Sequence, residues 1–262
     1  MQDLKGKAAI VTGSATGVGS ATAKLLAEQG CNVVVNYTKS KAEAEETMEA
    51  CRAAGARAIA VQANVAEDDD CKKLVDACIA EFGRLDHLVN NAGTTKFADH
   101  TDLPALSADD FRWIYSVNVV GPYQMIKHAE PHLRANGAGS VTNVSSIAGV
   151  TGLGSCIAYA ASKGALNTMT LSLARALGPE IRVNAICPGM IQGKWLREGM
   201  GEKKYDGYLQ HQMKTNPLQK VSTPEDNARA ILMFIAGSDL ITGETLLVDG
   251  GFHLGFSPTV AR

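Results

Sequence analysis

The stretch that decides the fold is Thr12-Gly13-Ser14-Ala15-Thr16-Gly17-Val18-Gly19, which joins a short apolar run to a segment with helical periodicity. Glycine at positions 13 and 17 lets the backbone approach a pyrophosphate, and Gly19 lets the helix pack tightly on the sheet. The helix N-terminus then offers free N–H groups and a positive dipole to phosphate oxygens. Glycine spacing alone also fits an ordinary strand–helix turn, but its place between a first strand and a helix favours dinucleotide binding.

Regular alternation of short apolar runs with longer helical patterns extends from this turn along the chain. The predicted strands are 8–11, 33–35, 58–61, 85–89, 141–144, 183–186 and 245–248. The predicted helices are 18–29, 41–54, 68–82, 108–134, 158–177 and 224–236. This order predicts an α/β fold, a single-domain Rossmann-type doubly wound parallel sheet of seven strands with helices on both faces, over residues 1–262. Segment 189–216 breaks the alternation and is predicted to be an irregular cover over a substrate site.

Composition limits the classes of partner. The 262 residues carry a formal net charge of −2, so there is no broad basic field for nucleic acid or an anionic membrane. No apolar run approaches the ~20 residues needed to span a bilayer, and the first residues lack a signal-peptide pattern. The six cysteines match no zinc template and are expected to be free thiols in a reducing cytoplasm. No metal site is expected, and His128 and His132 are interpreted as a surface pair.

A tyrosine four residues before a lysine occurs three times, as Tyr37/Lys41, Tyr123/Lys127 and Tyr159/Lys163. Tyr123 lies well inside a predicted helix, and Tyr37 follows the second predicted strand. Only Tyr159 opens a helix and has a serine, Ser146, thirteen residues upstream. With the G-x-x-x-G-x-G spacing, this set resembles the short-chain dehydrogenase/reductase family in its single-domain branch. The resemblance covers essentially the whole chain, including N-N-A-G at 90–93 and V-D-G-G at 248–251.

The chemistry of the third pair explains why these residue types occur together. A tyrosine titrates near pH 10, and a lysine one helical turn away stabilises tyrosinate and is expected to lower that pKa. Tyr159 is then the proton donor and acceptor at a carbonyl or alcohol oxygen, which the Ser146 hydroxyl orients. The resemblance implies that Lys163 also binds the nicotinamide ribose. It further implies that Asn118 holds water linking the lysine to solvent.

Cofactor contacts follow from the turn and from the resemblance. The predicted contacts are Gly13, Ser14, Thr16, Gly17, Val18, Gly19, Tyr37, Thr38, Lys39, Asn64, Val65, Asn91, Ala92, Gly93, Tyr159, Lys163, Pro188, Gly189 and Ile191. Two positions depart from the family pattern. Asn64 stands where the family usually has aspartate near the adenine, and Gly193 stands where it often has a threonine that contacts the nicotinamide amide.

The residues after the second strand bear on cofactor choice. Enzymes that favour NAD(H) place a carboxylate there to accept from the ribose 2′-hydroxyl. Tyr37 stands at that place, and no acid precedes Glu43. Thr38 and Lys39 can contact a 2′-phosphate, and Ser14 is expected to reach the same phosphate from the glycine turn. NADP(H) is therefore the favoured cofactor and NAD(H) the alternative.

The sequence therefore predicts a cytoplasmic oxidoreductase that moves hydride between a nicotinamide and a carbonyl or secondary alcohol. Thr95, Leu153, Met190 and Trp195 are candidate substrate contacts, which suits a medium-sized, largely apolar molecule. The resemblance makes a 3-oxoacyl thioester one candidate; a sugar, polyol or steroid-type alcohol is an alternative. A non-catalytic dinucleotide-binding module is a further alternative. The helices 108–134 and 158–177 are predicted to build a homo-oligomer, most simply a tetramer.

Overall fold

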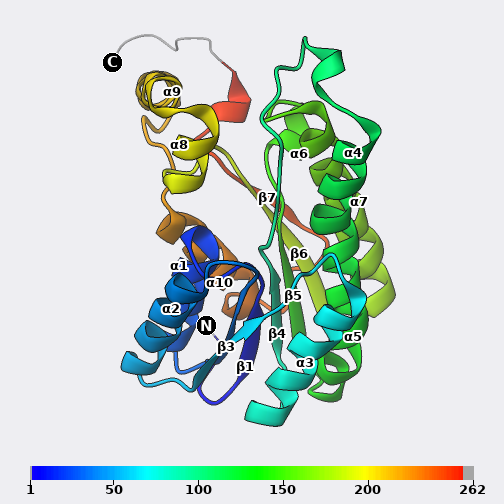
Figure 1. Ribbon diagram of the computed structural model, residues 1–262. Helices are drawn as coiled ribbons and strands as arrows, with labels where there is room; N and C mark the ends of the chain where they lie inside the picture. The colour runs from blue at the N-terminus through cyan, green and yellow to red at the C-terminus, as the bar shows by residue number, and fades with distance from the viewer. Residues whose placement is uncertain (1, 256–262) are drawn as a thin grey trace.

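The computed structural model describes residues 2–255 as helices that flank a parallel sheet (Figure 1). The strand order is β3-β2-β1-β4-β5-β6-β7, and every pairing is parallel. The strands are β1 (Ala8–Val11), β2 (Asn32–Tyr37), β3 (Ala58–Gln62), β4 (His87–Asn90), β5 (Gly139–Val144), β6 (Ile181–Pro188) and β7 (Thr245–Val248). The predicted seven-stranded, Rossmann-type sheet is confirmed.

The helices differ from the prediction mainly in two places. They are α1 (Gly17–Glu28), α2 (Lys41–Ala53), α3 (Asp68–Phe82), α4 (Ala108–Tyr115), α5 (Gly121–Ala135), α6 (Ala148–Thr151), α7 (Ile157–Leu177), α8 (Lys194–Met200), α9 (Glu202–Thr215) and α10 (Pro224–Ala236). A π-helical segment, η2 (Ser116–Val120), joins α4 to α5, where one long helix was predicted. The predicted irregularity of 189–216 is wrong over most of its length, because α8 and α9 form there. Short 3₁₀ turns lie at Leu103–Ala105 and Phe252–Leu254.

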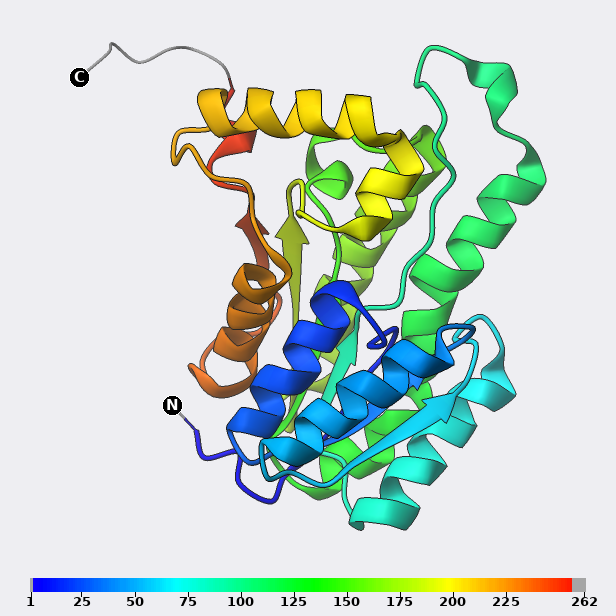
Figure 2. The ribbon, with the colours of Figure 1, turned by 60° about the vertical axis from the view of Figure 1, so that its left-hand side comes forward.

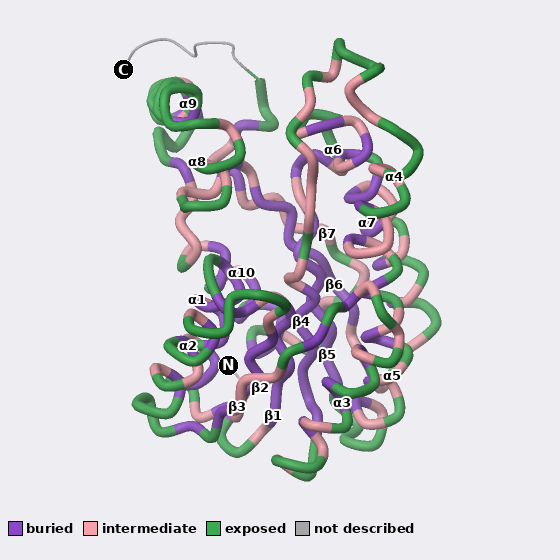
Figure 3. Tube along the Cα trace, in the orientation of Figure 1, coloured by how far each residue is buried: buried purple, intermediate pink, exposed green. Residues whose placement is uncertain are grey.

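Two apolar layers hold the helices on the sheet. On β1, Ala9 and Val11 face the layer under α1, α2 and α10, whereas Ala8 and Ile10 face the layer under α3, α5 and α7. Because side chains of a strand alternate between faces, a strand buried on both sides carries an unbroken apolar run. Figure 3 shows the strands as the buried centre, with α8 and α9 mostly exposed above them.

The candidate site is set by the point where the strand order reverses. The chain leaves β1 toward β2 on one side, and β4 lies against the other side of β1. Connections from these two strands therefore diverge, which leaves a crevice at their carboxyl ends. The glycine-rich turn follows β1, and the N-N-A-G segment follows β4. Figure 2 shows α8 and α9 lying across this end of the sheet.

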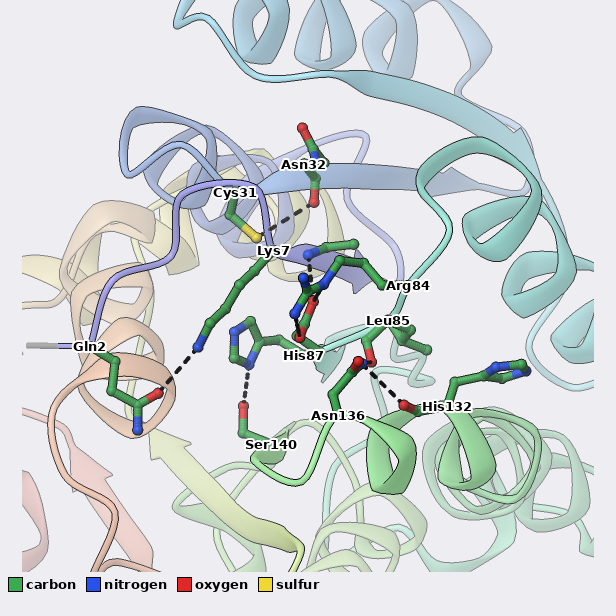
Figure 4. A network of polar contacts seen from close by, with 12 residues as sticks. Gln2, Lys7, Cys31, Asn32, Arg84, Leu85, His87, His132, Asn136 and Ser140 are labelled. Carbon is green, nitrogen blue, oxygen red and sulfur yellow. Dashed lines mark hydrogen bonds and ion pairs between the residues drawn. The ribbon is translucent and has the colours of Figure 1, made fainter.

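The opposite end of the sheet carries a buried polar network (Figure 4). His87 is fully buried, and its Nδ1 lies 2.8 Å from the Ser140 hydroxyl. Its Nε2 has no hydrogen-bond partner among residues 2–255. Burial lowers the pKa of His87 to about 3, although the carboxylate of Asp86 acts in the other direction. Asp86 is itself bound by the Arg84 guanidinium at 2.7 Å. His87 is therefore a neutral residue of the fold, far from the crevice.

Candidate active site

The glycine-rich turn packs directly against the segment after β4. A Cβ placed on Gly13 would lie 2.9 Å from the Cα of Ala92, and one on Gly19 would lie 2.5 Å from the Asn91 amide nitrogen. Gly17 is different, because its φ is +58° and a Cβ there would meet no atom within 4 Å. Of these three glycines, only Gly17 opens toward the crevice. Its exposed backbone at the start of α1 fits a pyrophosphate, whereas Gly13 and Gly19 are required by packing.

Asn36 and Thr12 hold this turn in place, a role that the sequence analysis did not predict for them. The Asn36 side-chain oxygen accepts from the Gly13 N–H at 2.9 Å, and its amide donates to the Ala63 carbonyl at 3.0 Å. The Thr12 hydroxyl oxygen accepts from the N–H groups of Asn91 and Ala92, each at 3.0 Å. These contacts fix the relative position of the loops after β1, β2, β3 and β4. An asparagine at the end of the second predicted strand is the sequence signal from which this positioning role could have been predicted.

The predicted contact of Ser14 with a 2′-phosphate is wrong. The Ser14 hydroxyl is fully buried, donates to the Val11 carbonyl at 2.6 Å and accepts from the Asn36 N–H at 2.9 Å. The Ser14 N–H donates to the Asn36 carbonyl at 2.9 Å. The hydroxyl and the N–H of Ser14 are thus engaged beneath the turn, which removes its side chain from the candidate cofactor contacts.

The adenosine end of the crevice lies between the ends of β2 and β3. Thr38 and Lys39 are exposed there, and Tyr37 is half-buried. Asn64 is also exposed, whereas the Val65 side chain is buried, so only its backbone is available to a ligand. An open hollow of about 260 Å³ lies beside them, lined by Thr38, Gln62, Ala63, Asn64, Asp70 and Lys73. Lys73 is a second cation at this end that the sequence analysis did not identify.

The two candidate hydroxyls lie together at the mouth of the crevice. Ser146 follows β5 and is half-buried, and a hydrogen bond joins its hydroxyl to that of Tyr159, near the start of α7. The neighbouring Ser145 is buried and donates to the Lys163 carbonyl at 3.1 Å, so it braces the helix instead. The structure thus places the serine thirteen residues upstream, and not its neighbour, beside the tyrosine.

Lys163 lies beneath this pair. Its side chain is only 3% exposed, its Nζ donates to the Val144 carbonyl at 2.8 Å, and it lies 5.6 Å from the centre of the Tyr159 ring. Burial lowers the pKa of Lys163 to about 8. Burial also raises the pKa of Tyr159 to about 12, and the hydrogen bond from Ser146 offsets this only in part. Burial thus acts against the lowering of the tyrosine pKa that the neighbouring lysine is expected to cause, and that lowering stays a prediction for the working site.

Asn118 reaches the same region from the π-helical segment. It is fully buried, its amide donates to the Thr94 carbonyl at 2.9 Å and to Ser162 Oγ at 3.0 Å, and its oxygen accepts from the Thr94 N–H at 2.8 Å. A Cβ on Gly93 would lie 3.5 Å from the Asn118 oxygen and 3.6 Å from Lys163 Nζ. The Asn118 side-chain oxygen and the Lys163 ammonium therefore both lie close to the backbone of Gly93. A π turn changes the helical register locally, which aims this asparagine inward.

The turn after β6 is held by the segment after β7. A Cβ on Gly189 would lie 2.8 Å from the Cβ of Asp249, and the Gly189 N–H donates to the Val248 carbonyl at 3.0 Å. At the other end of the cover, the Asn216 amide donates to the Asp249 carbonyl at 3.3 Å, and the Leu218 N–H donates to a carbonyl of the same V-D-G-G segment at 3.1 Å. Both ends of segment 189–216 are thus attached to one short stretch.

Other predicted positions in and before the cover have defined surroundings. Pro188 accepts from the Ile147 N–H at 2.9 Å, and Ile191 pairs with Ser222 in an isolated bridge. The Gly193 N–H donates to the Tyr205 hydroxyl at 3.2 Å. Among the predicted substrate contacts, Met190 is buried against Tyr205, whereas Trp195 and Leu153 are more than half exposed.

The lysines of the other two tyrosine–lysine pairs, Tyr37/Lys41 and Tyr123/Lys127, are exposed and form ion pairs with carboxylates. Lys41 pairs with Glu45 at 3.6 Å, and Lys127 pairs with Asp68 at 2.6 Å. His128 Nε2 lies 3.0 Å from the same Asp68 carboxylate. Within residues 2–255, no group of three or more His, Cys, Asp or Glu side chains could hold a metal ion.

Comparison with known proteins gives the same picture for nearly the whole chain. The sequence family described as enoyl-(acyl carrier protein) reductase matches residues 13–253. Ketoacyl reductase 2 of the granaticin polyketide synthase from Streptomyces violaceoruber is 43% identical, covering 94% of this chain and 96% of that protein. Glucose 1-dehydrogenase 2 from Bacillus subtilis is 36% identical, covering 97% of each. A short-chain dehydrogenase/reductase crystal structure from Burkholderia xenovorans superposes with a TM-score of 0.89 at 38% identity, covering 97% of this chain and 100% of that one.

The fold, the open glycine turn and the matched relatives define an NAD(P)-dependent oxidoreductase that acts on CH–OH and C=O groups. The chain belongs to the short-chain dehydrogenase/reductase family. None of the helices in residues 2–255 has the length and apolarity that a membrane span requires.

Proposed function

We propose that the protein is an NADP(H)-preferring reductase of the carbonyl group of a medium-sized, largely apolar substrate, with a 3-oxoacyl thioester as the leading candidate. The observation that carries this proposal is the Ser146–Tyr159 hydroxyl pair at the crevice, with the buried Lys163 ammonium beneath it. The same tyrosine can donate a proton in reduction and accept one in oxidation, so the reductive direction is proposed from the likeness to a ketoacyl reductase.

In the proposed mechanism, Ser146 donates a hydrogen bond to the substrate carbonyl oxygen and Tyr159 transfers its proton to that oxygen as it becomes an alcohol. Lys163 stabilises the tyrosinate that remains. Asn118 positions the loop at Gly93 beside the lysine. The family resemblance implies that it also holds water that links the lysine to solvent. The nicotinamide, when bound, supplies the hydride.

The cofactor is proposed to lie along the crevice from the glycine turn to the turn after β6. The contacts assigned to it are Gly13, Thr16, Gly17, Val18, Gly19, Tyr37, Thr38, Lys39, Asn64, Val65, Asn91, Ala92, Gly93, Tyr159, Lys163, Pro188, Gly189 and Ile191. The test of the catalytic assignment is Tyr159→Phe. Loss of turnover with cofactor binding retained supports an enzyme, whereas unchanged turnover contradicts the assignment. A protein that binds cofactor but turns over no carbonyl or alcohol would be a non-catalytic dinucleotide-binding module.

The preference for NADP(H) is proposed from the charges at the adenosine end. No acid stands between Asn36 and Lys41, and the exposed Lys39 and Thr38 can meet a 2′-phosphate. A charge-assisted contact to phosphate contributes about 1.5–3 kcal/mol, roughly 10- to 150-fold in affinity. The test is kcat/KM with each cofactor on one substrate, for the wild type and Lys39→Ala. Equal or better efficiency with NAD(H) overturns the proposed preference. If the preference for NADP(H) is unchanged in Lys39→Ala, the contact to the 2′-phosphate is assigned to Thr38 or Lys73 instead.

The substrate class is proposed from the relative named as a ketoacyl reductase and from the apolar rim of the cleft. The relative named as a glucose dehydrogenase supports the alternative, an NAD-dependent alcohol dehydrogenase for a sugar, polyol or steroid-type alcohol. A panel of ketones, 3-oxoacyl thioesters, sugars and steroids separates these classes, followed by absorbance of the reduced nicotinamide with both cofactors. Exclusive oxidation of sugars would favour the alternative.

A homo-oligomer, most simply a tetramer, is proposed from the outer faces of α5 and α7. An apolar groove of about 620 Å³ lies there, lined by Tyr123, Ala165, Thr168, Met169, Ser172, Leu173 and Ala176. A monomer mass in light scattering at micromolar concentration would contradict this proposal.

The six cysteines are free and buried, which is compatible with the cytoplasmic location that we also propose.

A further inference from the structure

One aromatic ring from the loop after β4 lies on the bare backbone of α8. A Cβ built on Gly199 would lie only 1.9 Å from Cε2 and 2.2 Å from Cζ of Phe97. Ordinary contacts begin at 3.4 Å, so any side chain at this position would force the ring or the helix to move by about 1.5 Å. The lack of a side chain at Gly199 therefore sets how closely α8 approaches the loop.

The loop that carries Phe97 is attached to the segment that carries the catalytic tyrosine. The Thr95 hydroxyl lies 2.5 Å from that of Ser155, and the Ala98 N–H donates to the Ser155 carbonyl at 2.9 Å. Ala98 also packs in the small apolar cluster that includes Tyr159. These contacts lie on both sides of Phe97, so its backbone is fixed relative to the proton donor.

On the cover side, the other contacts of α8 are made within the cover itself. Helix α8 contains no buried residue, but its Leu196 packs against Met190 and Tyr205, and its Arg197 lies 4.3 Å from the centre of the Tyr205 ring. These contacts position α8 relative to the rest of the cover and not relative to the loop after β4. Trp195, in its first turn, meets Phe97 with ring centroids 6.1 Å apart and planes tilted by 59°, a favourable arrangement for two aromatic rings. Both rings keep exposed surface at the rim, 36% of Phe97 and 52% of Trp195. The rim is thus apolar and is formed by residues from both sides of the cleft.

We propose that Phe97 is a specificity-determining residue: seated on Gly199, its ring fixes the distance between α8 and the wall that carries Tyr159. It thereby limits the size of the group beside the reacting carbonyl and favours an apolar, planar one. This inference rests on the proposed function, because it concerns the substrate of that same site. Removing the ring opens the rim, and adding a methyl group at Gly199 displaces the ring without removing it.

The first test reads the contact without any turnover. In a Trp113→Phe background, Trp195 is the only tryptophan left of the two in the chain, so its emission and acrylamide quenching report on the rim. Gly199→Ala and Phe97→Ala are expected to change both signals. Gly207→Ala is the matched control, because it lies in α9 of the same cover and its Cβ would meet nothing within 4 Å. Equal signals for Gly199→Ala and Gly207→Ala would overturn the proposal.

The second test measures size preference as the ratio of kcat/KM for 2-tetralone to that for cyclohexanone. Phe97→Ala is expected to raise this ratio by about tenfold or more, since pocket contacts of this size discriminate at that level. Gly199→Ala is expected to change it by at least about threefold, and to change nothing further in the Phe97→Ala background. A Gly199→Ala effect that persists without the ring, or a ratio that none of the variants changes, would overturn the inference alone. A wild type that turns over no carbonyl or alcohol overturns the proposed function and this inference with it.

Discussion

The two glycines of the first turn give a prediction that separates packing from ligand binding. Gly13 and Gly17 have nearly the same backbone conformation, with φ of +59° and +58°. They differ in surroundings, because an added Cβ meets the Ala92 backbone at 2.9 Å at Gly13 and nothing within 4 Å at Gly17. Alanine at the two positions therefore imposes the same backbone strain but a very different steric effect.

The magnitudes follow from these two contributions. A left-handed conformation costs an alanine about 1–2 kcal/mol, and this applies to both variants. Overpacking adds about 1–3 kcal/mol at Gly13 alone, because the obstacle is backbone and cannot swing away. The free energy of unfolding is therefore expected to fall by about 2–5 kcal/mol for Gly13→Ala and by about 1–2 kcal/mol for Gly17→Ala.

Urea unfolding without cofactor, at one fixed protomer concentration, measures this difference. A titration of reduced cofactor, followed by nicotinamide fluorescence, then measures binding. Gly17→Ala is expected to lose affinity while remaining the more stable variant, since its methyl group projects into the open space assigned to the pyrophosphate. Equal destabilisation by the two substitutions would refute the packing argument. Full affinity in Gly17→Ala would refute the assignment of that space.

Two further predictions concern charge. The pKa of Lys163 is about 8, so the rate of carbonyl reduction should decline above pH 8 as the ammonium loses its proton. Lys163→Met should lower turnover and remove that alkaline decline. A pH–rate profile of both proteins measures this. Lys127→Met, in a surface pair, should leave the profile in place, and a changed profile would contradict the assignment. Folding lowers the pKa of His87 from 6.5 to about 3, so between these pH values the unfolded chain binds a proton that the folded chain does not. The free energy of unfolding should therefore fall as the pH drops below about 6.5, by up to ~1.4 kcal/mol per pH unit. Urea unfolding between pH 7 and 4 should show a shallower slope for His87→Gln than for the wild type; equal slopes would contradict the argument.

The sheet and the long helices were predictable because their signals are local. Predicted segments 8–11 and 245–248 coincide with β1 and β7, and 68–82 and 224–236 coincide with α3 and α10. Unbroken apolar runs and a 3.6-residue period suffice for such elements. Helices α8 and α9 lack that signal, since α8 has no buried residue and α9 buries only Tyr205 and Gln212.

The candidate site was predictable where spacing along the chain decides geometry. Ser146, Tyr159 and Lys163 were chosen from three tyrosine–lysine pairs by an upstream serine, and the structure places them together. Contacts between distant segments were not predictable. The burial of Ser14 depends on Asn36, twenty-two residues later, and the raised pKa of Tyr159 depends on burial that no local pattern shows.

The attachment of both ends of the cover to the V-D-G-G segment has a consequence for biosynthesis. Gly189 and Asn216 rest on Asp249, which leaves the ribosome only after the glycine turn, the catalytic helix and the cover itself. A domain generally folds as a unit, so its final packing waits for the residues that complete it. Neither the turn after β6 nor the far end of the cover has its support until Asp249 has emerged and β7 pairs with β6. A growing chain therefore needs its last strand before this end of the crevice and its cover can take their final form.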